Sequence, residues 1–327
     1  AVTLDRFCGS GITSVNIVAS SVMSGREDLV LAGGTEMMST YGQDGNTPSP
    51  FMDNGNTRLR SEHPQPHQGV CADAIATLEG IDREAVDALA FVSQQNADKA
   101  IKGGHFDKSL IPVYNAEGEL VLDKEEFPRP QTTLEGLAEL KASVESLADY
   151  PLDEQGSTFR KLVLQKYPDL KINHVHHAGN SSGVVDGAAA LLLASPNYAK
   201  ANGMKPRERI KAMANMGDSP TLMLNAPVPA AKKVLEKANL TIDDIDLFEV
   251  NEAFSVVTEK FIRDLNIDRD KINVNGGAMA LGHPIGATGS ILVGTVLDEL
   301  ERRDLQFGLV TMCAAGGMAP AVIIDRV

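Results

Sequence analysis

Gly286-Ala-Thr-Gly289 opens a helix that we predict over residues 287–302, followed by a predicted strand over 307–313 and by Gly316-Gly317. The beginning of the chain has the same order. A glycine-rich turn and then a helix are predicted over residues 8–25, followed by an apolar strand over 29–32 and by Gly33-Gly34. Apolar residues at helical spacing support the first helix. The two units resemble the halves of an internal duplication.

The second half of the chain alternates between helices and short apolar strands. Predicted helices cover residues 183–194, 228–239, 253–265 and 287–302, and predicted strands cover 247–250, 272–275, 307–313 and 321–325. The helix over 183–194 is rich in small residues, so we expect it to be buried. This alternation predicts an α/β fold with mostly parallel sheets covered by helices.

The middle of the chain is less regular. Residues 39–67 are rich in Gly, Pro, Asn and Asp and are predicted to be loop, and amphipathic helices are expected over 68–79 and 82–102. A polar region runs to about residue 135, and a charged, helical segment over 135–172 is interrupted by two Tyr-Pro pairs. We therefore predict an inserted loop domain over 41–182, one half of the core from 1–40 and 183–205, and the other half from 206–327.

Composition and charge exclude several classes of protein. The 327 residues suffice for two or three compact units, and 30 basic against 44 acidic residues give a net charge of −14. A nucleic-acid partner is not expected, because proteins that follow phosphates carry a basic face. A membrane span is not expected either, since the longest apolar stretches fall short of about 18 residues. Three cysteines without a C-x-x-C pair argue against disulfides and structural zinc, and favour the reducing cytoplasm.

The first residues do not look like the start of a complete protein. Residues 1–7 have a strand-like pattern that would need neighbours on both sides, and they lead directly into the cysteine turn. We therefore expect an N-terminal segment to be missing, cleaved or carried on another chain, so that the N-terminal half is incomplete here.

Cys8 is the first candidate for catalysis. It is predicted at the end of a strand and in the first turn of a helix, where free backbone N–H groups and the helix dipole would lower its pKa and favour the thiolate. A strained turn would also lift the side chain toward a cavity. The alternative is a buried cysteine that acts as a small hydrophobe. Glycine at positions 9 and 11 favours the nucleophile, although the pair lacks the third glycine of a dinucleotide-binding loop.

His283 lies in the most specific stretch of the sequence, which runs from Asn275 to Gly289 and contains Gly282-His283-Pro284. The glycines allow the backbone to approach a ligand closely. A histidine held ahead of a helix can act as a base and then donate to an oxyanion. A phosphate-binding loop is disfavoured, because no Lys-Ser/Thr pair follows the glycines. A structural histidine remains the alternative.

Two further candidates lie at strand ends. Cys313, in Met312-Cys313-Ala-Ala-Gly-Gly317, offers a thiol that could move a proton between substrate and product, but this motif alone does not decide between that role and a structural one. Asn251, in Asn251-Glu-Ala-Phe254, is either a helix N-cap or an amide that orients a water or an oxyanion.

Other reactive side chains are interpreted as structural. His174 and His176 would share one face of a strand, but no carboxylate or thiolate lies nearby in the sequence to complete a metal shell, so we expect no metal. Cys71 lies in an amphipathic helical pattern and is interpreted as a core residue.

Five motifs occur in one order: Phe7-Cys8-x-Ser-Gly11, Ala178-Gly-Asn-x-Ser-Gly183, Asn251-Glu-Ala-Phe254, Gly282-His-Pro-x-Gly286 and Cys313. With this order the chain resembles the thiolases (acetyl-CoA acetyltransferases and 3-ketoacyl-CoA thiolases) over essentially its full length. Thr132-Thr-Leu-Glu-Gly136 and Pro227-Val-Pro229 are further matches. The resemblance implies a layered αβαβα core made of two duplicated halves with an inserted loop domain.

The resemblance also implies a two-step acyl transfer between CoA thioesters. Cys8 would carry the acyl group, His283 would activate it, and Cys313 would be the acid/base. Asn251, through a water, and His283 would form one oxyanion hole, and the N–H groups of Cys8 and Ala315 the other. Ser182, His67 and Met223 would contact CoA or border the acyl pocket. No permanently bound cofactor is implied, CoA is a substrate, and a homodimer or tetramer is expected.

The chain departs from the thiolase pattern in three places besides its beginning. Ala315 stands where a glycine is usual, Gln68 stands where many biosynthetic members have methionine, and residues 141–171 form a longer segment than in short-chain members. We expect these changes to alter the acyl pocket. The direction of the reaction and the chain length of its substrate are left open.

Two other functions compete with this one. A ketoacyl synthase shares the fold and the nucleophilic cysteine, but it has histidine or asparagine in place of Cys313. A non-catalytic CoA or lipid carrier would not need the four groups Cys8, His283, Asn251 and Cys313 together.

Overall fold

The computed structural model describes residues 1–41 and 52–327. Its α-helices are α1 (Ser10–Met23), α2 (Thr57–Glu62), α3 (Gln68–Glu79), α4 (Arg83–Lys102), α5 (Leu134–Ala138), α6 (Glu145–Ala148), α7 (Phe159–Leu164), α8 (Pro196–Ala201), α9 (Pro227–Ala238), α10 (Ser255–Leu265), α11 (Ala278–Leu281) and α12 (Ile285–Arg303). Its strands are β1 (Leu29–Met37), β2 (Val113–Tyr114), β3 (Leu120–Leu122), β4 (Asp186–Ala194), β5 (Glu208–Gly217), β6 (Leu247–Val250), β7 (Phe307–Thr311) and β8 (Met318–Arg326).

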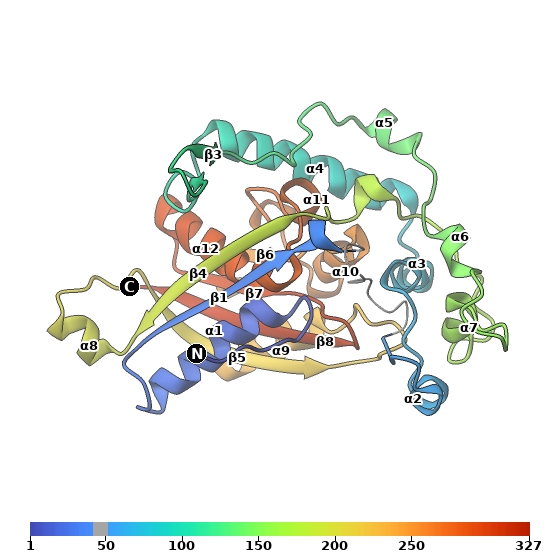
Figure 1. Ribbon diagram of the computed structural model, residues 1–327, viewed down its shortest axis with the longest axis horizontal. Coiled ribbons are helices and arrows are strands. Elements are labelled where there is room, and N and C mark those ends of the chain that lie inside the picture. The colour runs from blue at the N-terminus through green and yellow to red at the C-terminus, as the bar shows by residue number, and fades with distance from the viewer. Residues whose placement is uncertain (42–51) are drawn as a thin grey trace.

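Two sheets enclose the paired helices α1 and α12 (Figure 1). One sheet pairs β1 with β4, and the other has the order β5-β8-β7-β6. Helices α9 and α10 cover the outer face of the four-stranded sheet, where Phe248 of β6 meets Phe261 of α10. The described residues therefore stack as sheet, helices, sheet, helices, which are four of the five layers of the αβαβα core that the resemblance implies.

The prediction of mostly parallel sheets is wrong for the strands that the structure describes. Only β6 and β7 are parallel, whereas β1–β4, β5–β8 and β7–β8 are antiparallel. The short turn over residues 312–317 explains the last pair, because a connection of that length joins only antiparallel neighbours. The remaining pairs are joined by long segments that permit either direction.

The predicted helix over 183–194 is also wrong, since these residues contain strand β4. The run of Ala and Leu favours a helix by intrinsic propensity, but nine residues of β4 pair with nine of β1, from Leu29↔Ala194 to Met37↔Asp186. Alternate residues of β4 are exposed, as expected for a strand with one covered face. Here tertiary pairing outweighs local preference.

Other differences are smaller. Residues 1–7 form no strand, and only Arg6 makes an isolated bridge, to Cys8. The predicted strand over 272–275 is reduced to one bridge, between Ile272 and Phe248. Strand β5 and the hairpin β2–β3 were not predicted, and the 39–67 loop contains helix α2. Part of that loop, residues 42–51, lies outside the described residues.

The remaining long elements confirm the sequence predictions. Helices α3, α4, α9, α10 and α12 and strands β6, β7 and β8 lie within a few residues of their expected bounds. The 135–172 segment contains three short helices, α5, α6 and α7, as its interrupted pattern indicates. Among the residues described, no helix combines the length and apolarity needed to cross a bilayer.

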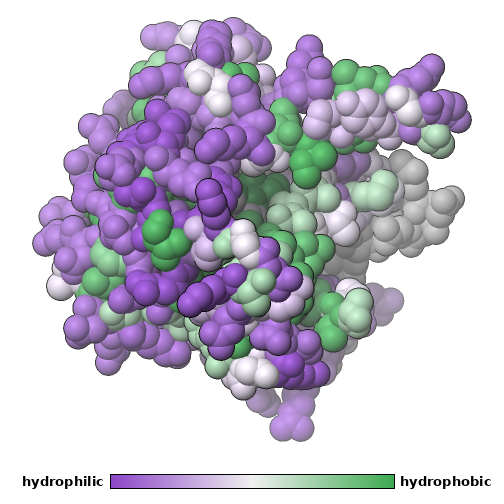
Figure 2. All heavy atoms as spheres, turned by 90° about the vertical axis from the view of Figure 1, so that its left-hand side faces the viewer, coloured by the Kyte–Doolittle hydropathy of each residue, from purple (hydrophilic) through white to green (hydrophobic). Residues whose placement is uncertain are grey.

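The outer face of the β1–β4 sheet is exposed and apolar. Leu31 is 66% exposed, Leu192 60% and Met37 59%, and all three project from the face opposite α1 and α12. Figure 2 views the molecule from the left side of Figure 1, and hydrophobic residues gather in its right-hand half, toward the side that carries β1 and β4. The rest of that view is mainly hydrophilic.

The crossing of α1 and α12 depends on glycine. A Cβ on Gly289 would lie 2.2 Å from the backbone nitrogen of Ile12, and one on Gly11 would lie 2.7 Å from the nitrogen of Gly289. These neighbours are backbone atoms that cannot swing aside. The two helices therefore approach each other at a distance that only paired glycines permit.

Gly289→Ala is expected to destabilise the protein by about 3 kcal/mol or more, because its methyl group would push the two backbones apart. Gly294→Ala on the same helix is the matched control. Its Cβ would meet open space, so the same change there should stabilise the protein by about 0.5–1 kcal/mol through helix propensity. Equilibrium urea unfolding of both variants measures the difference. Equal effects at the two positions would contradict the proposed close contact.

Candidate active site

Cys8 lies in a strained turn directly before α1. The preceding residue, Phe7, has φ of +52°, a left-handed conformation that is unusual for an aromatic residue. The hydroxyl of Ser10 closes the turn, because it accepts from the Arg6 N–H at 2.8 Å and donates to the Phe7 carbonyl at 2.7 Å. The strained turn expected from the sequence is thus confirmed, and it leaves Cys8 only 4% exposed.

The expected low pKa of Cys8 is wrong for this state of the protein. Burial raises the pKa of the thiol to about 11, although its own backbone N–H and a hydrogen bond from Gln68 favour the thiolate. The charge of Glu36 raises it further. Desolvation disfavours the charged form more than the helix terminus favours it. The resting group is a protonated thiol, so a base must take its proton before it can attack.

His283 is held as a neutral imidazole. The hydroxyl of Thr288 donates to the Pro284 carbonyl at 2.9 Å, so at 2.6 Å it must accept the proton of His283 Nδ1. This bond fixes the neutral Nδ1–H tautomer and leaves Nε2 as an acceptor, which Asn251 Nδ2 approaches to 3.3 Å. Burial lowers the pKa of His283 to about 4. Because the unfolded chain then takes up more protons, this histidine reduces stability as the pH falls from 6.5 toward about 4.

Asn251 faces Nε2 of His283. Its Nδ2 lies 3.3 Å from His283 Nε2, and its Oδ1 is buried with no hydrogen-bond partner in the described part of the chain. The neighbouring Glu252 is held by Ser93 Oγ at 2.7 Å and by Asn273 Nδ2 at 2.9 Å, which fixes the backbone beyond β6. Asn251 is therefore not an N-cap of α10, which begins at Ser255, but an amide directed at the imidazole.

Cys313 and Ala315 lie in the turn between β7 and β8. Burial raises the pKa of Cys313, and the negative charge of a Cys8 thiolate would raise it further. A Cβ on Gly9 would lie 3.2 Å from Ala314 Cβ, which places the two turns side by side. The left-handed residues of this turn are Gly316 and Gly317, so Ala315 is accommodated without strain.

The N–H groups of Cys8 and Ala315 are potential oxyanion donors. Within the ranges 1–41 and 52–327, neither N–H donates a hydrogen bond to another residue. Unpaired N–H groups at a buried turn can stabilise a developing negative charge without any rearrangement.

The three residues predicted to contact substrate lie on segments tied to this centre. Ser182 N donates to the Ala253 carbonyl at 3.0 Å, next to Asn251. His67 caps α3 by accepting from Gly69 N at 3.1 Å, and the buried Met223 follows Thr221, whose carbonyl accepts from the thiol of Cys71 at 3.3 Å. Cys71 is thus a core residue, as the sequence indicated.

His174 and His176 are paired with a carboxylate in the core. Both Nδ1 atoms lie within 2.7 Å of the fully buried Asp73, which also accepts from the backbone nitrogen of Val175. Burial opposes ionisation of Asp73, but these hydrogen bonds keep its pKa below the usual range. No cluster of three His, Cys, Asp or Glu side chains suited to a metal ion is found in the described ranges.

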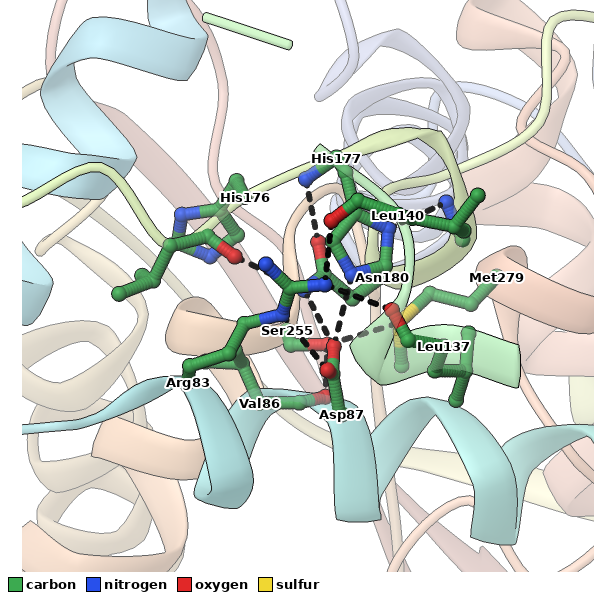
Figure 3. Close-up of polar contacts among 12 residues, drawn as sticks. Arg83, Val86, Asp87, Leu137, Leu140, His176, His177, Asn180, Ser255 and Met279 are labelled. Atoms are coloured by element: carbon green, nitrogen blue, oxygen red, sulfur yellow. Dashed lines mark hydrogen bonds and ion pairs between the residues drawn. The ribbon is translucent and has the colours of Figure 1, made fainter. Parts of the chain in front are cut away.

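Asp87 of α4 organises the segment that leads to Ser182 (Figure 3). One oxygen accepts from His177 Nε2 and from Asn180 Nδ2, each at 2.8 Å, and the other accepts from Arg83 Nε at 2.6 Å. Arg83 also donates to the carbonyls of Leu137 and Leu140, which joins α4 to α5. This network fixes the turn over 178–182 against the core.

The turn over 178–182 continues into a segment that bonds to the backbone around Asn251 and His283. Gly183 donates from its nitrogen to the Ala278 carbonyl, and its carbonyl accepts from His283 N at 2.9 Å. One segment therefore bonds to the backbone beside both Asn251 and His283. The structure brings Asn251 and His283 into contact and sets Cys8 near Cys313, with Ser182 tied to the same group.

Neither the contact of Thr288 with His283 nor that of Gln68 with Cys8 was predicted from the sequence. Gln68 was assigned only to the acyl pocket. Thr288 fixes the tautomer of His283, and its position in the first turn of α12 after the Gly-His-Pro motif was the available signal. Gln68 donates toward the sulfur of Cys8, which no pattern within the sequence indicates, because the two residues lie 60 positions apart.

Comparison with known proteins agrees with this geometry. Residues 1–146 match the family model "Thiolase, N-terminal domain" and residues 204–326 match "Thiolase, C-terminal domain". The chain is 37% identical to an acetyl-CoA acetyltransferase of Chromobacterium violaceum over 338 residues, covering 100% of this chain and 80% of that protein. It is 36% identical to a 3-ketoacyl-CoA thiolase of Bacillus subtilis, with 99% and 78% covered.

A solved structure is similar over the same range. The human mitochondrial 3-ketoacyl-CoA thiolase in complex with CoA superimposes with a TM-score of 0.83 at 33% identity, covering 100% of this chain and 78% of that one.

The alkylation of Cys8 by iodoacetamide is expected to speed up about tenfold for each pH unit from about pH 7 to about pH 9.5, with no plateau, because the thiol pKa lies near 11. Intact-mass spectrometry over time measures the rate, and Cys8→Ser identifies the signal of this thiol. A plateau below about pH 8 would show instead that the thiolate already dominates at neutral pH.

Asp87→Ala is expected to lower the free energy of unfolding by about 3 kcal/mol, because it leaves the buried His177 and Asn180 and the partly exposed Arg83 without their acceptor. Asp149→Ala is the matched control. Asp149 also binds an arginine, Arg160, at 2.7 Å, but its side chain is 60% exposed, so the loss there should stay below about 1 kcal/mol. Urea unfolding compares the two variants, and similar losses would mean that the Asp87 network contributes little.

Proposed function

The chain belongs to the thiolase family, and we propose from this that it transfers acyl groups between CoA thioesters through an acyl-cysteine at Cys8. The relatives above are named acetyl-CoA acetyltransferase and 3-ketoacyl-CoA thiolase, so the substrates are CoA, acetyl-CoA and 3-ketoacyl-CoA. The observation that carries the proposal is the neutral Nδ1–H tautomer of His283, which offers a basic Nε2 in a centre where the thiol is protonated.

In the first half of thiolytic cleavage, the sulfur of Cys8 attacks the 3-keto carbon while His283 Nε2 takes the thiol proton. The bond between C2 and C3 of the substrate then breaks. The electron pair moves to C2 as the enolate of acetyl-CoA, and Cys313 gives its proton to that carbon. Acetyl-CoA leaves, and the acyl group remains on Cys8.

In the second half, Cys313 is a thiolate and takes the proton of an incoming CoA thiol. The CoA sulfur attacks the acyl carbon, the bond to Cys8 breaks, and the Cys8 sulfur recovers its proton from His283. All groups return to their starting state. Condensation of acetyl-CoA is the same sequence in reverse, with Cys313 removing the proton from acetyl-CoA.

Negative charge develops on two different carbonyl oxygens, so two donor sites are required. The N–H groups of Cys8 and Ala315 serve the oxygen of the group bound to Cys8. His283, once protonated, serves the thioester oxygen of the enolate together with a water held by Asn251. The buried, unpartnered Oδ1 of Asn251 is a suitable acceptor for that water.

Binding of CoA is assigned to the loop domain over 41–182 and to three residues. Ser182 contacts CoA, and His67 and Met223 border the pantetheine and acyl groups. The tight anchoring of the 178–182 turn by Asp87 supports a role for this turn in holding a ligand. We also propose that the rest of the chain forms the two halves of the core, one from residues 1–40 and 183–205 and the other from residues 206–327.

Treatment with radiolabelled acetyl-CoA is expected to leave label on the protein, because the thioester at Cys8 is a true intermediate. Cys8→Ser should retain less than about 1% of the cleavage rate and carry no thioester label. Label on Cys8 without CoA-dependent turnover would favour a carrier, and activity with malonyl substrates would favour a synthase. A variant Cys313→Ala that still cleaves at the normal rate would contradict the assigned acid/base.

We also propose that the exposed face of β1–β4 is covered in the working protein by a second copy of the chain, giving a homodimer or a tetramer. An apolar face formed by Leu31, Met37 and Leu192 is disfavoured in water and favours association. All three cysteines are free thiols, which supports a cytoplasmic location.

Sedimentation equilibrium is expected to give a multiple of 34.9 kDa. Leu31→Ser with Leu192→Ser should weaken the association at least about tenfold, since two large side chains would leave the interface. A monomer that is unaffected by the pair of changes would overturn the proposed interface. Intact mass that shows a second, different polypeptide bound would favour instead a separate N-terminal fragment.

A further inference from the structure

A cleft lies between α4 and α10, and it reaches the hydrogen-bonded group of Ser93, Glu252 and Asn273. It consists of a larger cavity of about 760 Å³ and a smaller one of about 390 Å³. Asn96, Lys99, Val274 and Arg303 line both, so the two cavities adjoin. Cys8, His283 and Cys313 line neither of them. Cavities of this size are typical of small-molecule sites.

The part of the larger cavity's wall formed by Ala85, Ala88, Leu89 and Val92 of α4 is apolar, whereas most of its other lining residues are polar or charged. One face of α4 contributes residues from Ala85 to Lys99, including Leu89 and Val92. At a rise of about 1.5 Å per residue this face is about 21 Å long. Ile262 of α10 and Ile272 line the opposite side. The shape suits an unbranched apolar chain that lies along α4.

The smaller cavity is cationic. Lys99, Arg302 and Arg303 line it together with the half-buried His105 and two asparagines. Both arginines bind the single carboxylate of Glu299, and Arg302 does so at 2.6 Å and 2.9 Å. Lys99 has no ion-pair or hydrogen-bond partner within the ranges that the structure describes. Two arginines thus bind one carboxylate beside a lysine side chain without a partner in the described ranges. The cavity is therefore positive, although the whole chain carries a net charge of −14.

Glu299 stays charged in this arrangement. Burial opposes its ionisation, but hydrogen bonds from Arg302 and Asn275 and the charge of Arg303 outweigh burial and lower its pKa to about 2. It neutralises one of the three cations and leaves a positive chamber at one end of the cleft.

The larger cavity has polar groups of both signs. Arg263 and Arg269 share the carboxylate of Glu259, and Asp270 and Glu252 are its other acidic residues. Thr258 also lines this cavity, and its hydroxyl is fully buried without a partner in the described ranges.

We propose that this cleft binds a small amphipathic anion, with its phosphate or carboxylate head in the chamber around Lys99 and its unbranched apolar chain along α4. Charge complementarity fixes the direction in which the ligand lies, and the apolar wall supplies the contact area. The site is independent of the proposed acyl transfer, because no residue that we place in catalysis lines it.

Isothermal titration of the full chain with decyl phosphate below its micelle concentration tests the proposal. One molecule is expected to bind per chain. Val92→Glu should abolish binding, because it puts a carboxylate into the apolar wall at a residue that is 47% exposed and can change without unfolding the protein. Lys99→Gln should weaken binding about threefold or more.

Matched controls lie on the same helix. Gln95→Glu and Lys102→Gln make the same kinds of change on α4 at residues outside the cleft, and both should leave the affinity unchanged. Decanol and inorganic phosphate each supply only half of the ligand, so each should bind at least about tenfold more weakly than decyl phosphate.

The titration with decyl phosphate is finally repeated in the presence of saturating CoA. CoA should leave the decyl phosphate affinity unchanged, because Ser182, His67 and Met223, which we assign to CoA and the acyl pocket, do not line the cleft. Loss of binding in the presence of CoA, equal loss in the control variants, or no saturable binding of decyl phosphate would each overturn the proposal. None of these outcomes bears on acyl transfer to Cys8. Decanoate in place of decyl phosphate then distinguishes a carboxylate ligand from a phosphate one.

Discussion

The close crossing of α1 and α12 is the constraint on which the centre of this molecule depends. Gly11 and Gly289 allow the two backbones to touch, and each helix begins next to a residue that we assign to catalysis. Cys8 precedes one helix and His283 precedes the other. Any side chain at the crossing would move the two turns apart. The spacing of the thiol and the imidazole therefore depends on glycine at both positions.

Burial gives this centre its chemical character. It holds Cys8 and Cys313 as neutral thiols and His283 as a neutral imidazole, so the resting site has no charge among these groups. These three groups therefore form no ion pair with one another that a substrate would have to break. Charge appears only when the thiol proton moves to the imidazole, next to donors that are already oriented.

The sequence marked candidate site residues more clearly than it marked the topology. Cys8, His283, Asn251 and Cys313 were recognisable because glycines, a proline and strand ends mark each of them in the chain. Strand β4 was not recognisable, because a run of Ala and Leu has the composition of a helix and only its pairing with β1 makes it a strand. Thr288 and Asp87 also escaped notice, since hydroxyls and carboxylates are common and their roles depend on partners distant in sequence.

The same long-range pairing has a consequence for biosynthesis. Gly11 meets Gly289, and Asn16 donates to the Ala321 carbonyl, a separation of 305 residues. Contacts this distant close slowly, because the chain must lose much of its freedom before they form. On a ribosome the cysteine turn emerges long before Gly289 and Ala321, and its contacts with them must wait until they have been added. In an interrupted translation product the apolar face of α1 is therefore exposed, because α12 is absent. Chaperones and quality-control proteases would bind such a chain before it could fold.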